Sequence, residues 1–259
     1  MVRSRSSFCS GCWFGYYFVV QAALNTLYQT VVNLCYPPFC ISCRTSLEEC
    51  WLCRDCLESA IRIKAPFCQV CSRPYTGEFD SPFSCPDCED HPPAFDCVAT
   101  RYQATGIVRD LIHRFKYSGE FHLRNLLVSW LEEALSDPRV SAEPLDGLVP
   151  VPLHPTRIRE RGYDQIGALV ELLGKRRRIP VWLCLRRTRY TESQTRFSRK
   201  ERLQNLQNAF ELRKGSSVLG KRLLLVDDVL TTGSTLDECA RVLKNHGAQS
   251  VRAVTVARR

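Results

Sequence analysis

The amino-acid sequence predicts an α/β fold, a parallel sheet with helices on both faces, preceded by a small Cys-rich domain. Two contrasting halves predict this. Residues 1–100 hold 13 of the 15 cysteines, with 7 basic and 10 acidic side chains. Residues 101–259 carry 29 basic and 17 acidic side chains, and their aliphatic runs alternate with segments of helical periodicity. Such alternation is typical of βαβ units, whose strands are buried on both faces.

We expect three parts: an N-terminal segment 1–36, a Cys-rich domain 37–95 and an α/β domain 96–259. The hydrophobic content of 44% excludes a wholly disordered chain. Residues 6–43 contain no charged side chain. Their apolar residues between 24 and 34 recur mostly at three- and four-residue spacing, which predicts an amphipathic helix packed on a neighbouring domain. Polar residues interrupt this run, so membrane contact is not favoured.

Eight cysteines of the first half form four Cys-x-x-Cys pairs. The pairs are Cys40/Cys43, Cys53/Cys56, Cys68/Cys71 and Cys85/Cys88. A two-residue spacer lets both thiolates of a pair reach one tetrahedral ion, and two pairs complete a shell of four sulfur ligands. The spacing therefore predicts two structural zinc sites in the Cys-rich domain. Only His91 lies close enough to serve as an acid or base, which argues against a catalytic zinc.

The alternative for these cysteines is a disulfide framework, which is typical of small secreted domains. The sequence contains no Asn-x-Ser/Thr glycosylation site, and the α/β half is of a cytosolic kind. We therefore favour zinc and a cytoplasmic location. Two ligand pairings stay open: sequential, joining the first pair to the second and the third to the fourth, or interleaved. The sequential pairing is the simpler one.

The α/β domain is expected to alternate strands and helices in a regular order. We predict strands at 97–103, 147–153, 181–185, 222–229 and 250–257. We predict helices at about 105–117, 123–135, 166–173 and 236–245 from the spacing of their apolar residues. Ligands of such sheets bind beyond the carboxyl ends of the strands. The residues that follow each strand are therefore the candidates for a site.

The strand at 222–229 ends in two adjacent acids, Asp227 and Asp228, and a turn rich in hydroxyl groups follows. The turn residues are Thr231, Thr232, Gly233, Ser234 and Thr235. Backbone N–H groups and hydroxyls at a helix N-terminus form a site for a phosphate, and a glycine lets the backbone approach closely. Two carboxylates beside such a turn suit the hydroxyls of a sugar. The motifs typical of ATPases and of dinucleotide-binding proteins are absent.

The string from Leu223 to Thr235 resembles the phosphoribosyl pyrophosphate (PRPP) motif of type I phosphoribosyltransferases. The resemblance implies that Asp227 and Asp228 bind the ribose 2′ and 3′ hydroxyls. It also implies that Thr231–Thr235 hold the 5′-phosphate. PRPP would bind together with Mg²⁺, which keeps several waters and bridges phosphate oxygens.

More of the chain resembles one branch, the ComF/ComFC (GntX-like) competence proteins, which carry an N-terminal double zinc ribbon. The matching strings, in order, are the Cys pairs, PPAFD (92–96), LIHRFKYSG (111–119), VPVPLHPTRIRERGYDQ (149–165) and RKERLQNLQNAF (199–210). Asp164 stands where this family usually has Asn. By this resemblance the pyrophosphate loop is Pro152, Leu153 and His154. The cations expected to stabilise departing pyrophosphate are Lys116 and Arg161.

A strongly basic segment is the other functional signal. Residues 175–202 contain 11 basic and 2 acidic side chains, and Arg186, Arg187 and Arg189 cluster beside Tyr190. Such a patch can follow single-stranded nucleic acid. The resemblance implies DNA uptake in natural transformation, with competence-machinery proteins as partners. Two functions stay open: a PRPP-dependent transferase whose acceptor is unidentified, and a non-catalytic PRPP sensor that binds single-stranded DNA.

Overall fold

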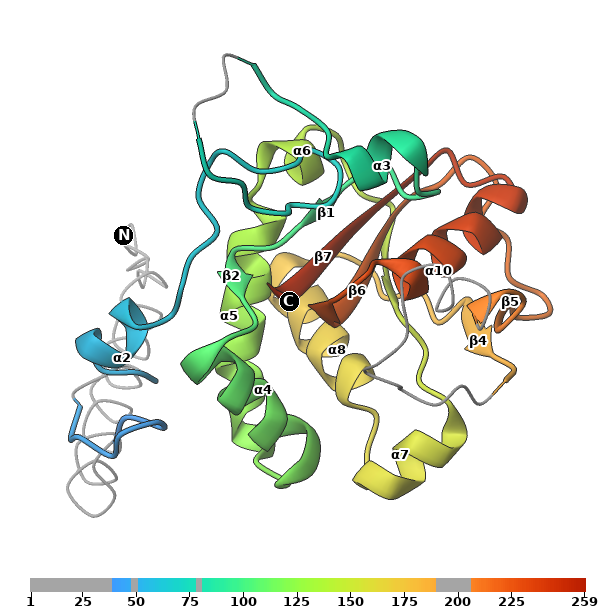
Figure 1. The fold of residues 1–259 in the computed structure, drawn as a ribbon. Helices are drawn as coiled ribbons and strands as arrows, with labels where there is room; N and C mark the ends of the chain where they lie inside the picture. Colours follow the sequence, from blue (N-terminus) through green and yellow to red (C-terminus); the bar gives the residue numbers. More distant parts are fainter. Residues whose placement is uncertain (1–38, 48–50, 78–80, 190–205) are drawn as a thin grey trace, which may run out of the picture. The chain divides into compact units, whose positions relative to one another are not determined.

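The protein is described by a computed structural model covering residues 39–47, 51–77, 81–189 and 206–259 (Figure 1). The predicted N-terminal helix lies outside these described residues. The chain divides into two compact units, Met1–Leu57 and Glu58–Arg259. Among the described helices, none has the length and apolar character needed to cross a bilayer.

The second unit is built on a parallel sheet, as predicted. Its described strands are β1 (Val98–Ala99), β2 (Tyr102–Gln103), β3 (Gly147–Pro150), β6 (Arg222–Leu230) and β7 (Ser250–Arg258). The order is β1-β7-β6-β3, with β2 also paired to β7. Every one of these pairings is parallel. Their carboxyl ends therefore meet at one edge of the sheet.

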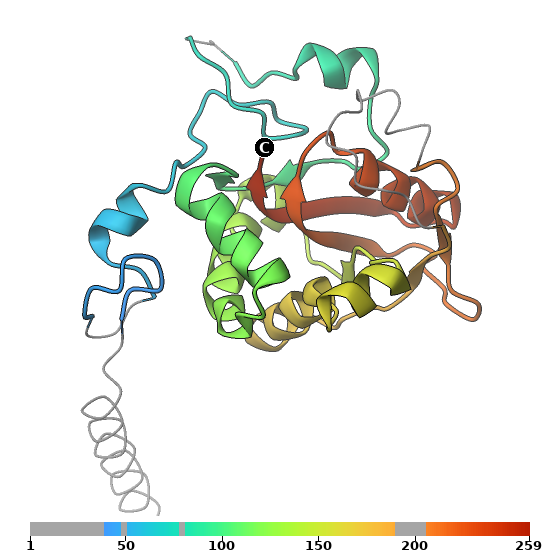
Figure 2. The same cartoon turned by 60° about the horizontal axis from the view of Figure 1, so that its bottom comes forward.

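Helices cover both faces of this sheet (Figures 1 and 2). The helices of this unit are α3 (Pro86–Asp90), α4 (Gly106–Tyr117), α5 (Arg124–Leu135), α6 (Pro138–Ser141), α7 (Pro155–Arg161), α8 (Gln165–Arg177) and α10 (Ser234–Asn245), with a 3₁₀ turn η1 (Phe121–Leu123). Helices α5 and α8 pack on one face, against β7, β6 and β3. Helix α10 packs on the other, in one apolar cluster with Leu223 and Leu225 of β6.

The largest departure from the predicted elements concerns residues 181–185, which do not form a strand of the main sheet. Val181 makes one parallel bridge to Leu148, and the chain then leaves the sheet. A side chain at Gly147 would meet the Trp182 ring at 2.6 Å, so a small residue is required where Trp182 crosses the start of β3. The strand β4 (Leu185–Arg187) pairs instead with β5 (Phe210–Leu212), in a separate antiparallel pair.

In the first unit, Phe39 and Ser46 form an isolated antiparallel bridge. The helix α2 (Arg54–Glu58) also begins in this unit. The bridge closes a tight turn around the first Cys-x-x-Cys pair, in which Cys40 N–H donates to Thr45 O at 2.8 Å. A short helix then begins at Arg54, directly after Cys53, and contains Cys56. These two local turns bring four cysteines together without a large apolar core.

Candidate functional site

The two adjacent aspartates lie where β6 reaches the carboxyl edge of the sheet. β6 is flanked by β3 and β7, and Asp227 is in register with Thr255 of β7. Asp228 is 7% exposed, and Asp227 is half-buried. Side chains of a strand alternate between its faces, so adjacent acids at a strand end present their carboxylates in different directions. The doublet thus lies near the carboxyl end of a sheet strand, as the sequence predicted, and ligands of such sheets commonly bind beyond this edge.

Lys116, from the last turn of α4, forms an ion pair with Asp228. Its Nζ lies 2.7 Å from Asp228 Oδ1, and the two side chains are 16% and 11% exposed. A hydrogen bond between charged groups in so dry a place is stronger than one in water. The sequence predicted Lys116 as a partner of pyrophosphate, whereas the structure places it on the aspartate doublet. It thus joins α4 to the carboxyl edge of the sheet.

Asp227 carries the most perturbed carboxyl group of this edge. Burial raises the pKa of Asp227 to about 7, and the negative charge of Asp228 adds to the rise. Lys116 opposes this rise, as does the half-buried Arg187. The Asp228 backbone N–H donates to Asp227 Oδ1 at 2.8 Å. A carboxyl group that titrates near neutrality at a strand end is a candidate ligand-binding group.

The β6–α10 turn, residues 231–235, connects the doublet to helix α10. Gly233 adopts a left-handed conformation with φ of 81° and occupies the N-cap position, where a side chain would be strained. Thr232 Oγ1 and Ser234 Oγ lie 2.9 Å apart and share a hydrogen bond. The twelve-residue α10 directs its N-terminal N–H groups at this turn. The turn thus presents hydroxyl and N–H donors together, the chemistry that binds an anion.

The predicted pyrophosphate loop leads into α7, whose first turn it caps. His154 Nδ1 accepts a hydrogen bond from Thr156 N–H at 3.2 Å. At the other end of α7, the guanidinium of Arg161 donates to Gln165 Oε1 at 2.5 Å and to the hydroxyl of Tyr117 at 3.1 Å. Arg161 is therefore held beside the end of α4, next to Lys116.

Gln165 is a residue that sequence reasoning missed. It is fully buried at the start of α8 and donates through Nε2 to Lys116 O at 2.9 Å, while its Oε1 accepts from Arg161. One amide thus connects the two residues predicted to bind pyrophosphate. The sequence shows only that a polar residue, Gln165, follows the N-cap of a helix, and this does not reveal the residues to which its amide binds. Asp164 is that N-cap, accepting from Gly167 N–H at 3.0 Å.

The eight predicted zinc ligands form two separate clusters of four cysteines. In each cluster the sulfur atoms all lie within 4.8 Å of one another. The members are Cys40, Cys43, Cys53 and Cys56 in the first cluster, and Cys68, Cys71, Cys85 and Cys88 in the second. The structure therefore has the sequential pairing, and every described cysteine is a free thiol. Four sulfur ligands within reach of one point fit a structural zinc ion.

The second Cys cluster is buried in the α/β unit rather than lying apart from it. The guanidinium of Arg139 donates to Gln69 O at 2.8 Å and to Ser72 Oγ at 3.0 Å. Arg258, at the end of β7, donates to Cys71 O at 2.7 Å and is 6% exposed. Sequence reasoning missed both arginines. For Arg258 the signal was a charged residue at the end of the apolar strand β7, because such a residue must find partners when buried.

The basic residues of β4 face opposite ways. Arg186 is exposed and forms an ion pair with Glu211 of β5 at 2.7 Å. Arg187 points inward, with its guanidinium over the Phe210 ring at 5.2 Å from the ring centre. Arg189 is exposed. The structure therefore separates the predicted nucleic-acid residues into two exposed arginines and one that lies near the aspartate doublet.

Two family models match the chain. The model described as a phosphoribosyl transferase domain matches residues 168–259, and the one described as a double zinc ribbon domain matches residues 31–89. The first match contains the aspartate doublet and the β6–α10 turn. The second contains both Cys clusters.

Whole proteins from several bacteria are similar to this chain. Competence protein F of Haemophilus influenzae is 31% identical over 230 residues, which cover 85% of this chain and 96% of that protein. The DNA utilization protein YhgH of Escherichia coli K12 is 32% identical over 229 residues, covering 81% of this chain and 96% of that protein. Competence protein ComFC of Streptococcus pneumoniae is 28% identical over 216 residues, covering 82% and 89%. These similarities extend over both the Cys-rich and the α/β parts.

Proposed function

Because this chain belongs to the competence protein F family, we propose that it binds PRPP with Mg²⁺ and acts in DNA uptake. One observation carries the binding proposal: Asp227 and Asp228 lie near the end of β6, shortly before a turn rich in N–H and hydroxyl donors. The ribose hydroxyls of PRPP donate to the two carboxylates. The turn binds the 5′-phosphate. The names of the relatives support the link to DNA.

The residues around the doublet fit a Mg²⁺–PRPP complex. Mg²⁺ prefers oxygen ligands and is commonly bound through substrate phosphates with several waters retained. The negative doublet favours a divalent cation beside the sugar. When bound, the ion offsets the charge of the pyrophosphate group. The chain's own cations, Lys116 and Arg161, are joined through Gln165 and supply positive charge at the same edge.

Transfer of the phosphoribosyl group is the reaction that this arrangement supports. The bond between the anomeric carbon and the pyrophosphate oxygen breaks, and the electron pair leaves with pyrophosphate. An acceptor atom then supplies the electron pair for the new bond to that carbon and releases its proton to solvent. Positive charge near Lys116 and Arg161 stabilises the departing group.

Pyrophosphate release, measured with PRPP, Mg²⁺ and a panel of bases, amines and DNA strands, tests transfer. We expect release that depends on one acceptor class and is lost in Arg161→Ala. Retained PRPP binding without release from any acceptor would favour the alternative, a PRPP sensor.

The pKa of Asp227 predicts that PRPP binding releases protons. A hydroxyl that donates to a carboxylate favours the charged form, so binding lowers a pKa that is about 7 in the free protein. At pH 7 we expect release of about half a proton, and affinity that rises with pH until Asp227 is fully ionised. Calorimetry in two buffers of different ionisation enthalpy measures the release. The variant Asp227→Asn measures the proton release that comes from the phosphates of PRPP alone. Equal proton release in this variant and in the wild-type chain would contradict the prediction.

A second candidate function, binding of single-stranded DNA, is favoured by the exposed arginines of β4 and its following turn. Arg186 and Arg189 both face solvent. Each phosphate contact adds about 0.7 to the slope of log affinity against log salt for single strands. Arg186→Ala with Arg189→Ala should therefore lower the slope by about 1.4. An unchanged slope, or an equal fall with the exposed pair Lys64→Ala and Arg109→Ala, would count against this surface.

A further inference from the structure

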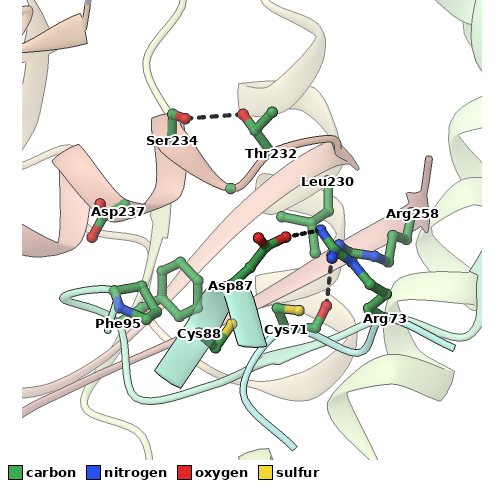
Figure 3. Close-up of a pocket in the computed structure, with 12 residues that line it drawn as sticks. Cys71, Arg73, Asp87, Cys88, Phe95, Leu230, Thr232, Ser234, Asp237 and Arg258 are labelled. Carbon is green, nitrogen blue, oxygen red and sulfur yellow. Dashed lines mark hydrogen bonds and ion pairs between the residues drawn. The ribbon is translucent and has the colours of Figure 1, made fainter. Parts of the chain in front are cut away.

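A hollow of about 350 Å³ adjoins the β6–α10 turn. Its walls include Thr231 and Thr232 of the turn, together with Arg73, Asp87, Arg258 and Arg259. A narrow crevice that also touches Arg73, Asp87, Thr232 and Arg258 continues between the turn and the second Cys cluster (Figure 3). Asp227, Asp228 and Lys116 line neither space. The turn thus has a second face, distinct from the aspartate doublet.

The side chains that line this hollow carry a net positive charge. Three guanidinium groups and one carboxylate line it. Arg73 forms an ion pair with Asp87 at 2.5 Å, and Figure 3 shows these side chains beside Arg258. Arg258 is held in place by its bond to Cys71 O and is 6% exposed. Asp87 and the second Cys cluster offset part of this positive charge, and a bound anion would offset the remainder.

Anchoring the Cys cluster does not account for all of these groups. One nitrogen of Arg258 holds Cys71 O, and Arg139 holds the backbone on the other side of the same turn. Arg259 follows the end of β7 and is exposed, yet it lines the hollow. The volume lies in the range of small-molecule sites, about 300 to 1,000 Å³. Guanidinium groups bind phosphate through paired N–H donors.

We propose that this hollow binds a phosphate group of a second ligand, a free nucleotide or a nucleic-acid strand, next to the phosphoribosyl site. Arg73, between Cys71 and Cys85 in the sequence, and Arg258 and Arg259, at and just after the end of β7, provide the positive charge. The neighbouring position of the two ligands rests on the proposed function, since Thr231 and Thr232 would hold PRPP. The zinc-binding segment then forms part of a ligand site in addition to stabilising the fold.

Calorimetric titration of the full chain with thymidine 5′-monophosphate tests this site. We expect the nucleotide to bind while Mg²⁺–PRPP is saturating, and thymidine to bind at least tenfold more weakly. Arg259→Ala should weaken nucleotide binding about tenfold and leave PRPP affinity unchanged. Arg73→Ala should also weaken nucleotide binding about tenfold and leave PRPP affinity unchanged. An unchanged zinc content of this variant would show that the second Cys cluster is intact.

The variant Asp227→Ala with Asp228→Ala separates this proposal from the proposed function. If this variant loses PRPP binding but keeps nucleotide binding, both proposals are supported. If the wild-type chain binds the nucleotide but not PRPP, the proposal for the hollow is supported and the proposed function is not. Stronger binding of a 5′-phosphorylated oligothymidine than of the mononucleotide identifies a strand as the ligand, and the reverse identifies a free nucleotide. Equal binding of thymidine and its phosphate, or unchanged affinity in Arg259→Ala, would overturn the site.

Discussion

Replacing Asp227 and Asp228 together by alanine will abolish Mg²⁺-dependent PRPP binding to this chain. Each carboxylate is expected to accept a hydrogen bond from a ribose hydroxyl, and a hydrogen bond to a charged group contributes about 1.5 to 3 kcal/mol. Losing two such bonds weakens binding by about 100-fold or more. Titration calorimetry with Mg²⁺–PRPP measures this loss.

The same replacement is not expected to unfold the protein. Removing Asp227 removes a carboxyl whose pKa is raised by burial and by its neighbour, so its loss relieves repulsion. Removing Asp228 leaves the charge of Lys116 without its ion-pair partner. Adding Lys116→Met to the double variant removes this buried charge and separates its effect on stability from the effect of losing the aspartates. Asp110→Ala, at an exposed aspartate on α4, is the matched control and should bind PRPP normally. Undiminished binding by the double variant would refute the ribose assignment.

Loss of the second zinc site will destabilise the α/β unit far more than loss of the first. All four sulfur ligands of the second cluster are buried, and this segment is held by Arg139 and Arg258. Zinc binding of this kind contributes about 10 to 16 kcal/mol to folding in small domains. Cys85→Ser should therefore lower the melting temperature of Glu58–Arg259 sharply. The first cluster belongs to the other compact unit, so Cys43→Ser should leave that melting transition in place.

Zinc content by elemental analysis and calorimetric melting together test this difference. Each ligand variant should retain one zinc ion per chain instead of two. Cys97→Ser is the control for a buried cysteine outside both clusters, and it should retain both ions. Equal melting temperatures for Cys43→Ser and Cys85→Ser would contradict the unequal roles of the two sites.

The sequence predicted most elements of the sheet and both Cys clusters because local spacing determines them. A Cys-x-x-Cys pair converges on one ion whatever surrounds it, so eight ligands followed directly from the spacing. The strand that carries Asp227 and Asp228 was equally clear, since an aliphatic run before two acids and a turn has few alternatives. The prediction of a main-sheet strand at 181–185 was wrong, because an apolar run indicates burial but does not show which sheet the segment joins. There Val181 bridges to Leu148, Trp182 lies against Gly147, and the chain then leaves the main sheet.

The contacts that build the site depend on residues far apart in sequence, and no periodicity reports them. Lys116 and Asp228 are 112 positions apart, and Arg258 and Cys71 are 187 apart. Gln165 illustrates the same limit, because only the folded chain shows that its amide joins Lys116 to Arg161. Charged or amide residues in buried elements were the available signals. They indicate that a partner exists without identifying it.

A crystal structure of the chain with Mg²⁺ and PRPP tests the central claim most directly. We expect the ribose hydroxyls within hydrogen-bond distance of Asp227 and Asp228, with the 5′-phosphate in the β6–α10 turn. Lys116 should then lie near the pyrophosphate. An empty turn at saturating PRPP, or a sugar bound away from both carboxylates, would contradict the account.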